Sequence, residues 1–201
     1  MNPREEVPMA AELLEDVTLS MPLLRDWTWD DLRRTPEDGR RWEIIDGSLD
    51  VSASPTLRHQ LAASRLAAAL LAAAPADVEV TGPVDVELDD SVLAPDVVVF
   101  PADAVDDHSP LAAGKILLAV EVVSPSSRRM DRTVKPSILA EHGVPAYWRV
   151  ELDVPGAPAV VVHALADGEV VTVHAGETVT VDAPFVVELR PAELAGPRRR
   201  G

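Results

Sequence analysis

Residues 116–123 read Ile-Leu-Leu-Ala-Val-Glu-Val-Val, which is the most continuously apolar stretch of the chain. A short apolar run of this kind predicts a strand that is buried on both faces, at the centre of a sheet. Its single carboxylate, Glu121, lies near the end of the run. Because a buried carboxylate without a partner costs several kcal/mol, we expect Glu121 to face a cleft at the strand end or to meet a cation.

The segments around this run alternate between helical and extended patterns. Asp46-Gly47 is a two-residue turn signal inside a predicted hairpin over 42–52. Thr28 with Asp31 fits a capping box at the start of a short helix. Further elements are expected as a helix at 56–74, strands at 78–80, 84–88 and 92–100, a helix at about 129–142, and strands at 146–152, 159–165, 169–174 and 177–181. The pattern predicts an α/β domain with a mixed central sheet flanked by helices and a strand-rich C-terminal third.

Length and composition narrow the class of protein. The chain has 201 residues, which suits a single domain, and it has no cysteine, which excludes a disulfide framework, a thiolate zinc site and a cysteine nucleophile. It has no apolar run long enough to span a membrane and no signal-peptide pattern at its start, so we expect a cytoplasmic protein. We expect a flexible acidic arm over 1–26, one domain over 27–190 and a disordered basic tail over 191–201.

The charge of the chain is strongly negative but unevenly distributed. A net charge of −16 disfavours a nucleic-acid partner, because affinity for phosphate comes from Lys and Arg. From Arg128 to Lys135, however, four basic residues stand against one acid, and a local basic segment can act on an acidic protein. The nucleophile elbow, the P-loop and the dinucleotide-binding fingerprint are all absent from the sequence.

The chemistry that remains is that of carboxylates. Asp96 follows Pro95 and opens the apolar run 97–100, and Glu121 lies in the central run. Two carboxylates on neighbouring strands would form an oxygen-rich site suited to Mg²⁺ or Mn²⁺. The alternative interpretation is that Asp96 caps a turn and Glu121 pairs with an arginine.

Three other polar residues are candidates for the same site. The chain has 16 arginines and only two lysines, so Lys135 can mark a need for a compact point charge, although it can equally be a solvated helix residue. Glu43 in the predicted hairpin and His59 at the start of the next helix both lie beside apolar positions. A lone histidine is more often a structural hydrogen-bonding group, and a glutamate near a hairpin turn is usually exposed.

Taken together and in order, these motifs resemble one family. They are Arg41 to Gly47, Ser54-Pro55, His59-Gln60, Pro95-Asp96-Val97, Val120 to Ser126, Asp131, Lys135, Gly143-Val144-Pro145 and Tyr147-Trp148. The set closely resembles a bacterial restriction-endonuclease-like family, formerly catalogued as a domain of unknown function, within the PD-(D/E)XK nuclease superfamily. The resemblance covers about residues 27–165.

The resemblance implies a restriction-endonuclease-like core and a role for each candidate. Asp96 and Glu121 match the metal ligands of the family, Glu43 its additional acid and His59 its histidine. The superfamily lysine normally stands two residues after the second acid, where this chain has Val123; in this family Lys135, on the following helix, matches it. The chain departs from the family pattern at three positions, which are Pro136, Leu139 and Ala146. Because a proline disrupts a helix interior but is tolerated in its first turn, we expect the helix to start close to Lys135.

The function that follows is a Mg²⁺- or Mn²⁺-dependent endonuclease acting on DNA, and the resemblance also implies a homodimer. Arg128, Arg129 and Arg132 are the expected phosphate contacts. One alternative is a catalytically inactive nuclease fold that binds nucleic acid or serves as an assembly module. The other is a metal-dependent hydrolase of a different phosphoester, because a fold does not fix a substrate.

Overall fold

The largest sheet of this computed structural model, which describes residues 25–105, 110–155, 157–165 and 168–195, has six strands. They are β3 (Val78–Thr81), β6 (Val97–Pro101), β8 (Leu118–Val123), β9 (Ala146–Glu151), β10 (Ala159–Ala164) and β11 (Glu169–His174), in the spatial order β11-β10-β9-β8-β6-β3. β8 is buried at every position, as its apolar sequence predicts. It pairs in parallel with β9 and antiparallel with β6, so the expected mixed sheet with a central strand in this stretch is confirmed.

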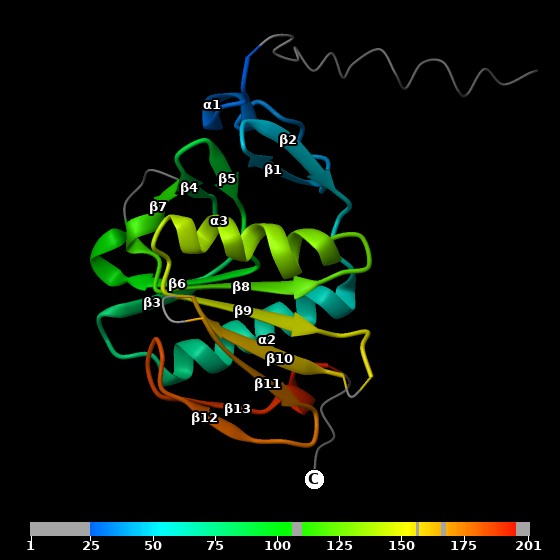
Figure 1. Cartoon of the computed structure of the whole chain (residues 1–201), viewed down its shortest axis with the longest axis vertical. Coiled ribbons are helices and arrows are strands. Elements are labelled where there is room, and N and C mark those ends of the chain that lie inside the picture. Colours follow the sequence, from blue (N-terminus) through cyan, green and yellow to red (C-terminus); the bar gives the residue numbers. More distant parts are fainter. Residues whose placement is uncertain (1–24, 106–109, 156, 166–167, 196–201) are drawn as a thin grey trace, which may run out of the picture.

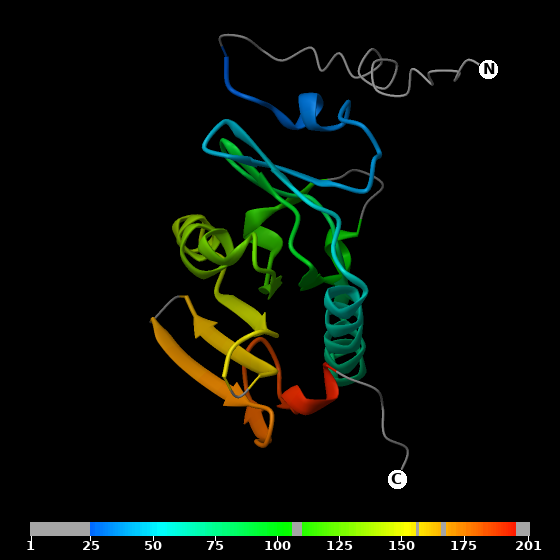
Figure 2. The same ribbon diagram turned by 90° about the vertical axis from the view of Figure 1, so that its right-hand side faces the viewer.

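Helices cover both faces of this sheet. α2 (Leu57–Ala73) packs on one face and α3 (Lys135–Glu141) on the other (Figures 1 and 2). Leu118, Val120 and Val122 of β8 belong to the core that α2 completes, whereas Ala119 belongs to the core that contains α3. Because side chains alternate along a strand, Glu121 is in phase with Ala119 and lies on the α3 side of the sheet.

A second sheet of five strands carries the N-terminal hairpin. Its strands are β1 (Arg41–Ile45), β2 (Ser48–Ser52), β4 (Val86–Leu88), β5 (Ser91–Leu93) and β7 (Leu111–Ala112), in the order β2-β1-β5-β4-β7. β1 and β2 pair antiparallel, and Asp46 and Gly47 between them have φ angles of 47° and 69°. Positive φ at both central residues is what a tight two-residue hairpin turn requires, so the predicted hairpin is confirmed.

The expectation of one strand over 92–100 is wrong. β5 ends at Leu93 and β6 begins at Val97, and the two strands belong to different sheets. Pro95 lies at the break, where it has no N–H to donate to a ladder. The break places Asp96 at the very start of β6, beside the central strand.

The helix predicted over 129–142 is present, and its α-helical part, α3, begins at Lys135 with Pro136 in its first turn, as expected, but a further helical segment precedes it. The chain is helical from Arg128 to Glu141 and includes a π-helical turn, η3 (Met130–Val134), immediately before α3. The backbone N–H of Lys135 donates to the carbonyl of Met130, five residues earlier. Because Pro136 has no N–H and crowds the preceding turn, the wider π turn accommodates it without ending the helix. Lys135 therefore lies within the helix and is buried.

The C-terminal end of the described chain belongs to the folded domain. β12 (Val179–Val181) and β13 (Val187–Leu189) form a hairpin, of which β13 was not predicted, and η4 (Pro191–Glu193) follows. Leu194 is buried in the same core as α2, and the domain boundary expected at 190 stays a prediction. The rest of the predicted tail, 196–201, lies outside the described residues, as does nearly all of the predicted acidic arm, 1–24.

The remaining helices are short. α1 (Trp29–Leu32) begins at the predicted capping box, in which the Thr28 N–H donates to the Asp31 carboxylate at 3.0 Å. Single 3-10 turns, η1 (Ala102–Ala104) and η2 (Ala113–Lys115), lie in the segment between β6 and β8. Within the described parts of the chain, no helix is both long and apolar enough to span a membrane.

Candidate active site

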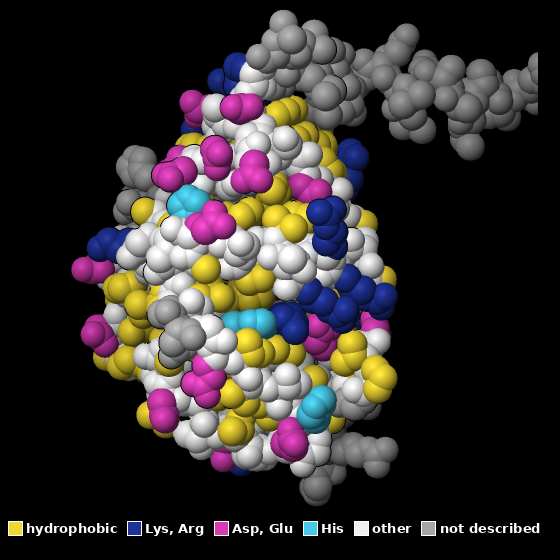
Figure 3. Space-filling model, in the orientation of Figure 1, with side chains coloured by type: hydrophobic (Ala, Val, Ile, Leu, Met, Phe, Trp, Pro, Cys, Tyr) yellow, Lys and Arg dark blue, Asp and Glu magenta, His cyan; other side chains and the backbone are white. Residues whose placement is uncertain are grey.

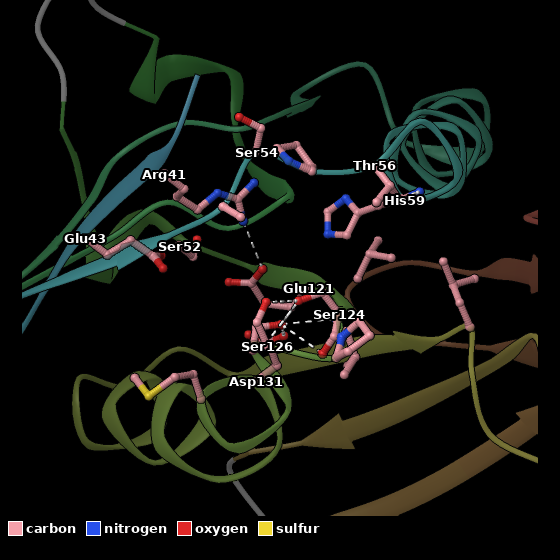
Figure 4. A pocket seen from close by; sticks show the side chains of 18 of the residues that line it. Arg41, Glu43, Ser52, Ser54, Thr56, His59, Glu121, Ser124, Ser126 and Asp131 are labelled. Carbon is pink, nitrogen blue, oxygen red and sulfur yellow. Dashed lines mark hydrogen bonds and ion pairs between the residues drawn. The ribbon is translucent and has the colours of Figure 1, made fainter. Parts of the chain in front are cut away.

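A pocket of about 530 Å³ opens where the β1–β2 hairpin, the start of α2 and the end of β8 meet (Figure 4). The turn after β8 forms one wall of the pocket. Two hydrogen bonds between Ser124 and Ser127 hold this turn together. The Ser127 N–H donates to Ser124 Oγ at 3.1 Å, and the Ser124 N–H donates to Ser127 Oγ at 3.0 Å. This reciprocal pair closes the 124–127 turn directly before the helix that begins at Arg128.

Four carboxylates from four separate elements meet beside this pocket. Glu43 comes from β1, Asp96 from the start of β6, Glu121 from β8 and Asp131 from η3, and all four are buried. The structure thus brings the three sequence-predicted acids together. Asp131 was not among the predicted site residues, although its place four residues before Lys135 on a helix puts both side chains on one face.

Two positively charged side chains, those of Lys135 and Arg41, lie among these acids. Lys135 Nζ lies 2.8 Å from Glu43 Oε2 and 2.7 Å from Glu121 Oε1, and the lysine side chain is only 3% exposed. Arg41 donates to Asp96 through one terminal nitrogen, and its other terminal nitrogen lies 3.5 Å from Glu121 Oε2. Sequence reasoning placed Lys135 here but did not single out Arg41.

Backbone groups and a histidine fix the acids in place. The Ala94 N–H donates to Glu43 at 2.8 Å, and the Val122 N–H donates to Asp96 at 2.7 Å. His59 Nε2 lies 3.2 Å from Asp96 Oδ2. The histidine reaches this position because Thr56 caps α2 through the His59 N–H, so that the ring leaves the first turn of the helix toward β6.

The electrostatic environment divides the acids into two kinds. Burial alone would raise the pKa of Asp96, but the His59 hydrogen bond and the charge of Arg41 hold it well below its usual range. Burial raises the pKa of Glu121 well above its usual range, with Lys135 opposing and Asp96 adding to the shift. Burial likewise raises the pKa of Asp131 to about 6. The site therefore combines one acid that is held ionised with two acids whose protonated form burial favours.

The four carboxylates are the kind of ligand that suits a hard divalent cation, although their oxygens already contact Arg41 and Lys135. Among the described residues, no three His, Asp or Glu side chains are placed to hold a metal together. In this structure Arg41 and Lys135 lie against the carboxylate oxygens instead. Four buried acids stand against these two cations, and a bound divalent cation would supply positive charge where burial raises the pKa of Glu121 and Asp131. Carboxylate oxygens are also the ligands that Mg²⁺ and Mn²⁺ prefer.

The predicted phosphate contacts lie next in sequence to residues that line the pocket, Ser127, Met130 and Asp131, but do not line it themselves. Arg128, Arg129 and Arg132 are all exposed at the start of the helix, and Figure 3 shows basic side chains gathered beside the ends of β8 and β9. Arg132 also forms a two-point ion pair with Glu151, at 2.9 and 2.7 Å. Arg149, which sequence reasoning missed, donates to the same carboxylate at 3.0 Å.

Comparison with known proteins agrees with this picture. A family model described as "Uma2: Putative restriction endonuclease" matches residues 29–194. Among solved structures, the chain is similar to a "putative nuclease belonging to DUF820" from Anabaena variabilis, with a TM-score of 0.66 and 18% identity, over 84% of this chain and 97% of that one. At this identity the likeness concerns the fold, and it confirms the expected α/β nuclease-like class. No curated protein sequence gives a significant match.

Proposed function

Since the chain belongs to the Uma2 family of restriction-endonuclease-like proteins, we propose that it is a Mg²⁺- or Mn²⁺-dependent endonuclease that hydrolyses phosphodiester bonds in DNA. The observation that carries the proposal is the buried Lys135 ammonium, held 2.7 Å from Glu121 at the wall of an open pocket. A buried lysine between carboxylates beside a cavity is costly for a structural role alone, and such sites are typical of catalysis.

The chain's own residues supply binding, orientation and charge. Asp96 and Glu121 would hold the metal, which polarises a phosphate and lowers the pKa of the attacking water. Glu43 contacts the same Lys135 ammonium that Glu121 contacts, and so helps to hold it in place. Lys135 can then orient the water or neutralise charge that develops on the phosphate. His59 contacts Asp96 Oδ2, which also accepts from the Val122 N–H, and so helps to orient this carboxylate.

Metal-dependent plasmid cleavage tests the proposal. We expect the wild type to nick or linearise supercoiled DNA with Mg²⁺ or Mn²⁺ but not with EDTA. Asp96→Asn should lower the rate by at least about 100-fold, because it removes a charged ligand and keeps the shape. The matched control is Asp153→Asn, an exposed acid that lines the same pocket and pairs with Arg58.

Three results would contradict the endonuclease assignment. Cleavage that is unaffected by EDTA or by Asp96→Asn would remove the metal from the proposal. DNA that is bound but never cut would identify an inactive binding module. Hydrolysis of a small phosphodiester without cleavage of DNA would identify a different phosphoester substrate.

We also propose a homodimer. β11 is an edge strand of the six-stranded sheet, and its Val170 and Val171 are 53% and 40% exposed. An exposed edge with apolar side chains favours pairing with another chain. Static light scattering should give twice the mass of one chain, and a monomer at working concentration would contradict this.

A further inference from the structure

We infer that Arg41 occupies the position of the divalent ion in the metal-free protein, and that its guanidinium moves out into the pocket when the ion binds. This inference rests on the metal-binding part of the proposed function. It assigns Arg41 two successive partners, which are the acids Asp96 and Glu121 without the ion and a substrate phosphate with it. The Arg41 guanidinium and the ion therefore could not occupy the position between these two carboxylates at the same time.

The first support is the position of the guanidinium. Its two terminal nitrogens contact Asp96 and Glu121, the two acids proposed to hold the ion. Figure 4 shows Arg41 reaching from β1 across the pocket toward Glu121 on β8. A cation between two carboxylates satisfies the same oxygens that a divalent ion would require, so both cannot bind there at once.

The second support is that Asp96 has no access to the pocket. Glu43, Glu121, Asp131 and Lys135 line the cavity, but Asp96 does not, and its side chain is only 3% exposed. Arg41 and His59, which both contact Asp96, do line it. An ion that enters through the pocket therefore reaches the Asp96 carboxylate only when one of these side chains moves.

The third support is that Arg41 can move without unfolding anything. Arg41 is the first residue of β1, pairs with Ser52 of β2 and is 17% exposed, whereas the Lys135 side chain is 3% exposed. Its long side chain starts at the wall of a cavity of about 530 Å³, which has room for it. A planar guanidinium released there matches the two-point geometry of a phosphate.

Mn²⁺ binding by isothermal titration calorimetry, without DNA, tests this exclusion. We expect Arg41→Met to bind Mn²⁺ at least about tenfold more tightly than the wild type, because a competing positive charge is gone. Arg41→Lys should lie between them, since a compact ammonium cannot bridge both acids. The matched control is Arg58→Met, which removes the same charge from the same pocket but contacts Asp153 and the Leu152 carbonyl. Its Mn²⁺ affinity should stay within about twofold of the wild type.

Cleavage should move in the opposite direction from metal affinity. Arg41→Met should cut DNA at least about tenfold more slowly despite its tighter Mn²⁺ binding, which a merely structural arginine would not produce. If the variant unfolds in EDTA, the measurement becomes its thermal midpoint, and Mn²⁺ should raise that midpoint more than it raises the wild-type value.

Mn²⁺ affinity in both Arg41 variants that is equal to or weaker than wild type would overturn the inference. The inference and the endonuclease proposal can also fail separately. Tighter Mn²⁺ binding by Arg41→Met in a protein that never cuts DNA would support the exclusion and contradict the endonuclease. If the wild type cuts DNA but Arg41→Met does not bind Mn²⁺ more tightly, the endonuclease proposal would be supported and the exclusion contradicted.

Discussion

Lys135 shows how one buried charge can depend on its neighbours. Burial alone would lower the pKa of this lysine, but Glu121 and Glu43 raise it above its usual range, so the ammonium stays charged. A compact ammonium can donate to two carboxylates that converge on a single point. In a chain with 16 arginines and two lysines, this position is one where a guanidinium would not fit the same geometry.

Replacing Lys135 should separate catalysis from metal binding. Lys135→Met leaves Glu43 and Glu121 buried without their shared partner, so the free energy of unfolding in EDTA should fall by about 3–5 kcal/mol. Cleavage should be lost, and Lys135→Arg should fail as well. Mn²⁺ binding should persist because an ammonium is not a ligand. Urea denaturation with and without Mn²⁺ measures both effects, and a variant that keeps full cleavage would reduce Lys135 to a structural residue.

His163 makes folding stability depend on pH. Burial, and then the charge of Arg149, lower the pKa of this histidine, and the Tyr147 ring packs 5.9 Å away. A histidine with a lowered pKa binds fewer protons folded than unfolded near its ordinary value of about 6.5, so this contribution to stability is lost as pH falls through that region. Between pH 7.5 and 5.5 the thermal midpoint of the wild type should therefore fall more than that of His163→Gln. If the thermal midpoints of the two proteins fell equally, His163 would not be the source of this pH dependence.

Among the helices and strands, those with a clear apolar periodicity or turn motif within their own segment could be predicted from the sequence. The central strand, the Asp46-Gly47 hairpin and α2 follow from apolar periodicity and turn chemistry within each segment. The break at Pro95 and the π turn before Lys135 do not, because the sheet that a strand joins and the register of a helix depend on tertiary packing. A continuous apolar run over 97–100 hides the change of sheet just before it.

The same distinction holds for the side chains of the site. Glu43, Asp96 and Glu121 could be placed together because ordered motifs carry them. Arg41 opens a strand and Asp131 sits in a basic segment, so both resemble exposed residues in the sequence. Only the pairing of β1 with the rest of its sheet and the turn of η3 bring them to buried partners.

Gly82 fixes the position of Asp96 from the neighbouring segment. A Cβ at Gly82 would lie 2.3 Å from the Asp96 carbonyl oxygen, so one of the two backbones must shift. Gly82→Ala should lower the free energy of unfolding by about 1–3 kcal/mol and slow cleavage by at least about tenfold, although no site side chain is altered. Gly176→Ala, where nothing lies within 4 Å, is the control for denaturation and plasmid assays. Equal behaviour of the two variants would show that Asp96 is not held this way.

Across the whole molecule, a net charge of −16 must be reconciled with a nucleic-acid substrate. Repulsion from the acidic surface slows encounter with DNA, and salt screens that repulsion. Ion pairs such as Arg132 with Glu151 engage part of the positive charge near the pocket. We therefore expect the proposed DNA binding to rely on a few local arginines near the pocket rather than on the overall field.

The salt dependence of DNA binding should reveal this local patch. With the inactive Asp96→Asn protein, changing both Arg128 and Arg129 to Gln should reduce the slope of log K against log salt by about 2, because each lost phosphate contact contributes about 0.9. The control changes Arg33 and Arg34 to Gln, which alters net charge equally at the end of α1, a different element, where both residues pair with acids. Fluorescence anisotropy with a labelled duplex at several salt concentrations gives both slopes. Equal slopes in the two double variants would place the DNA away from the start of this helix, since only total charge would then matter.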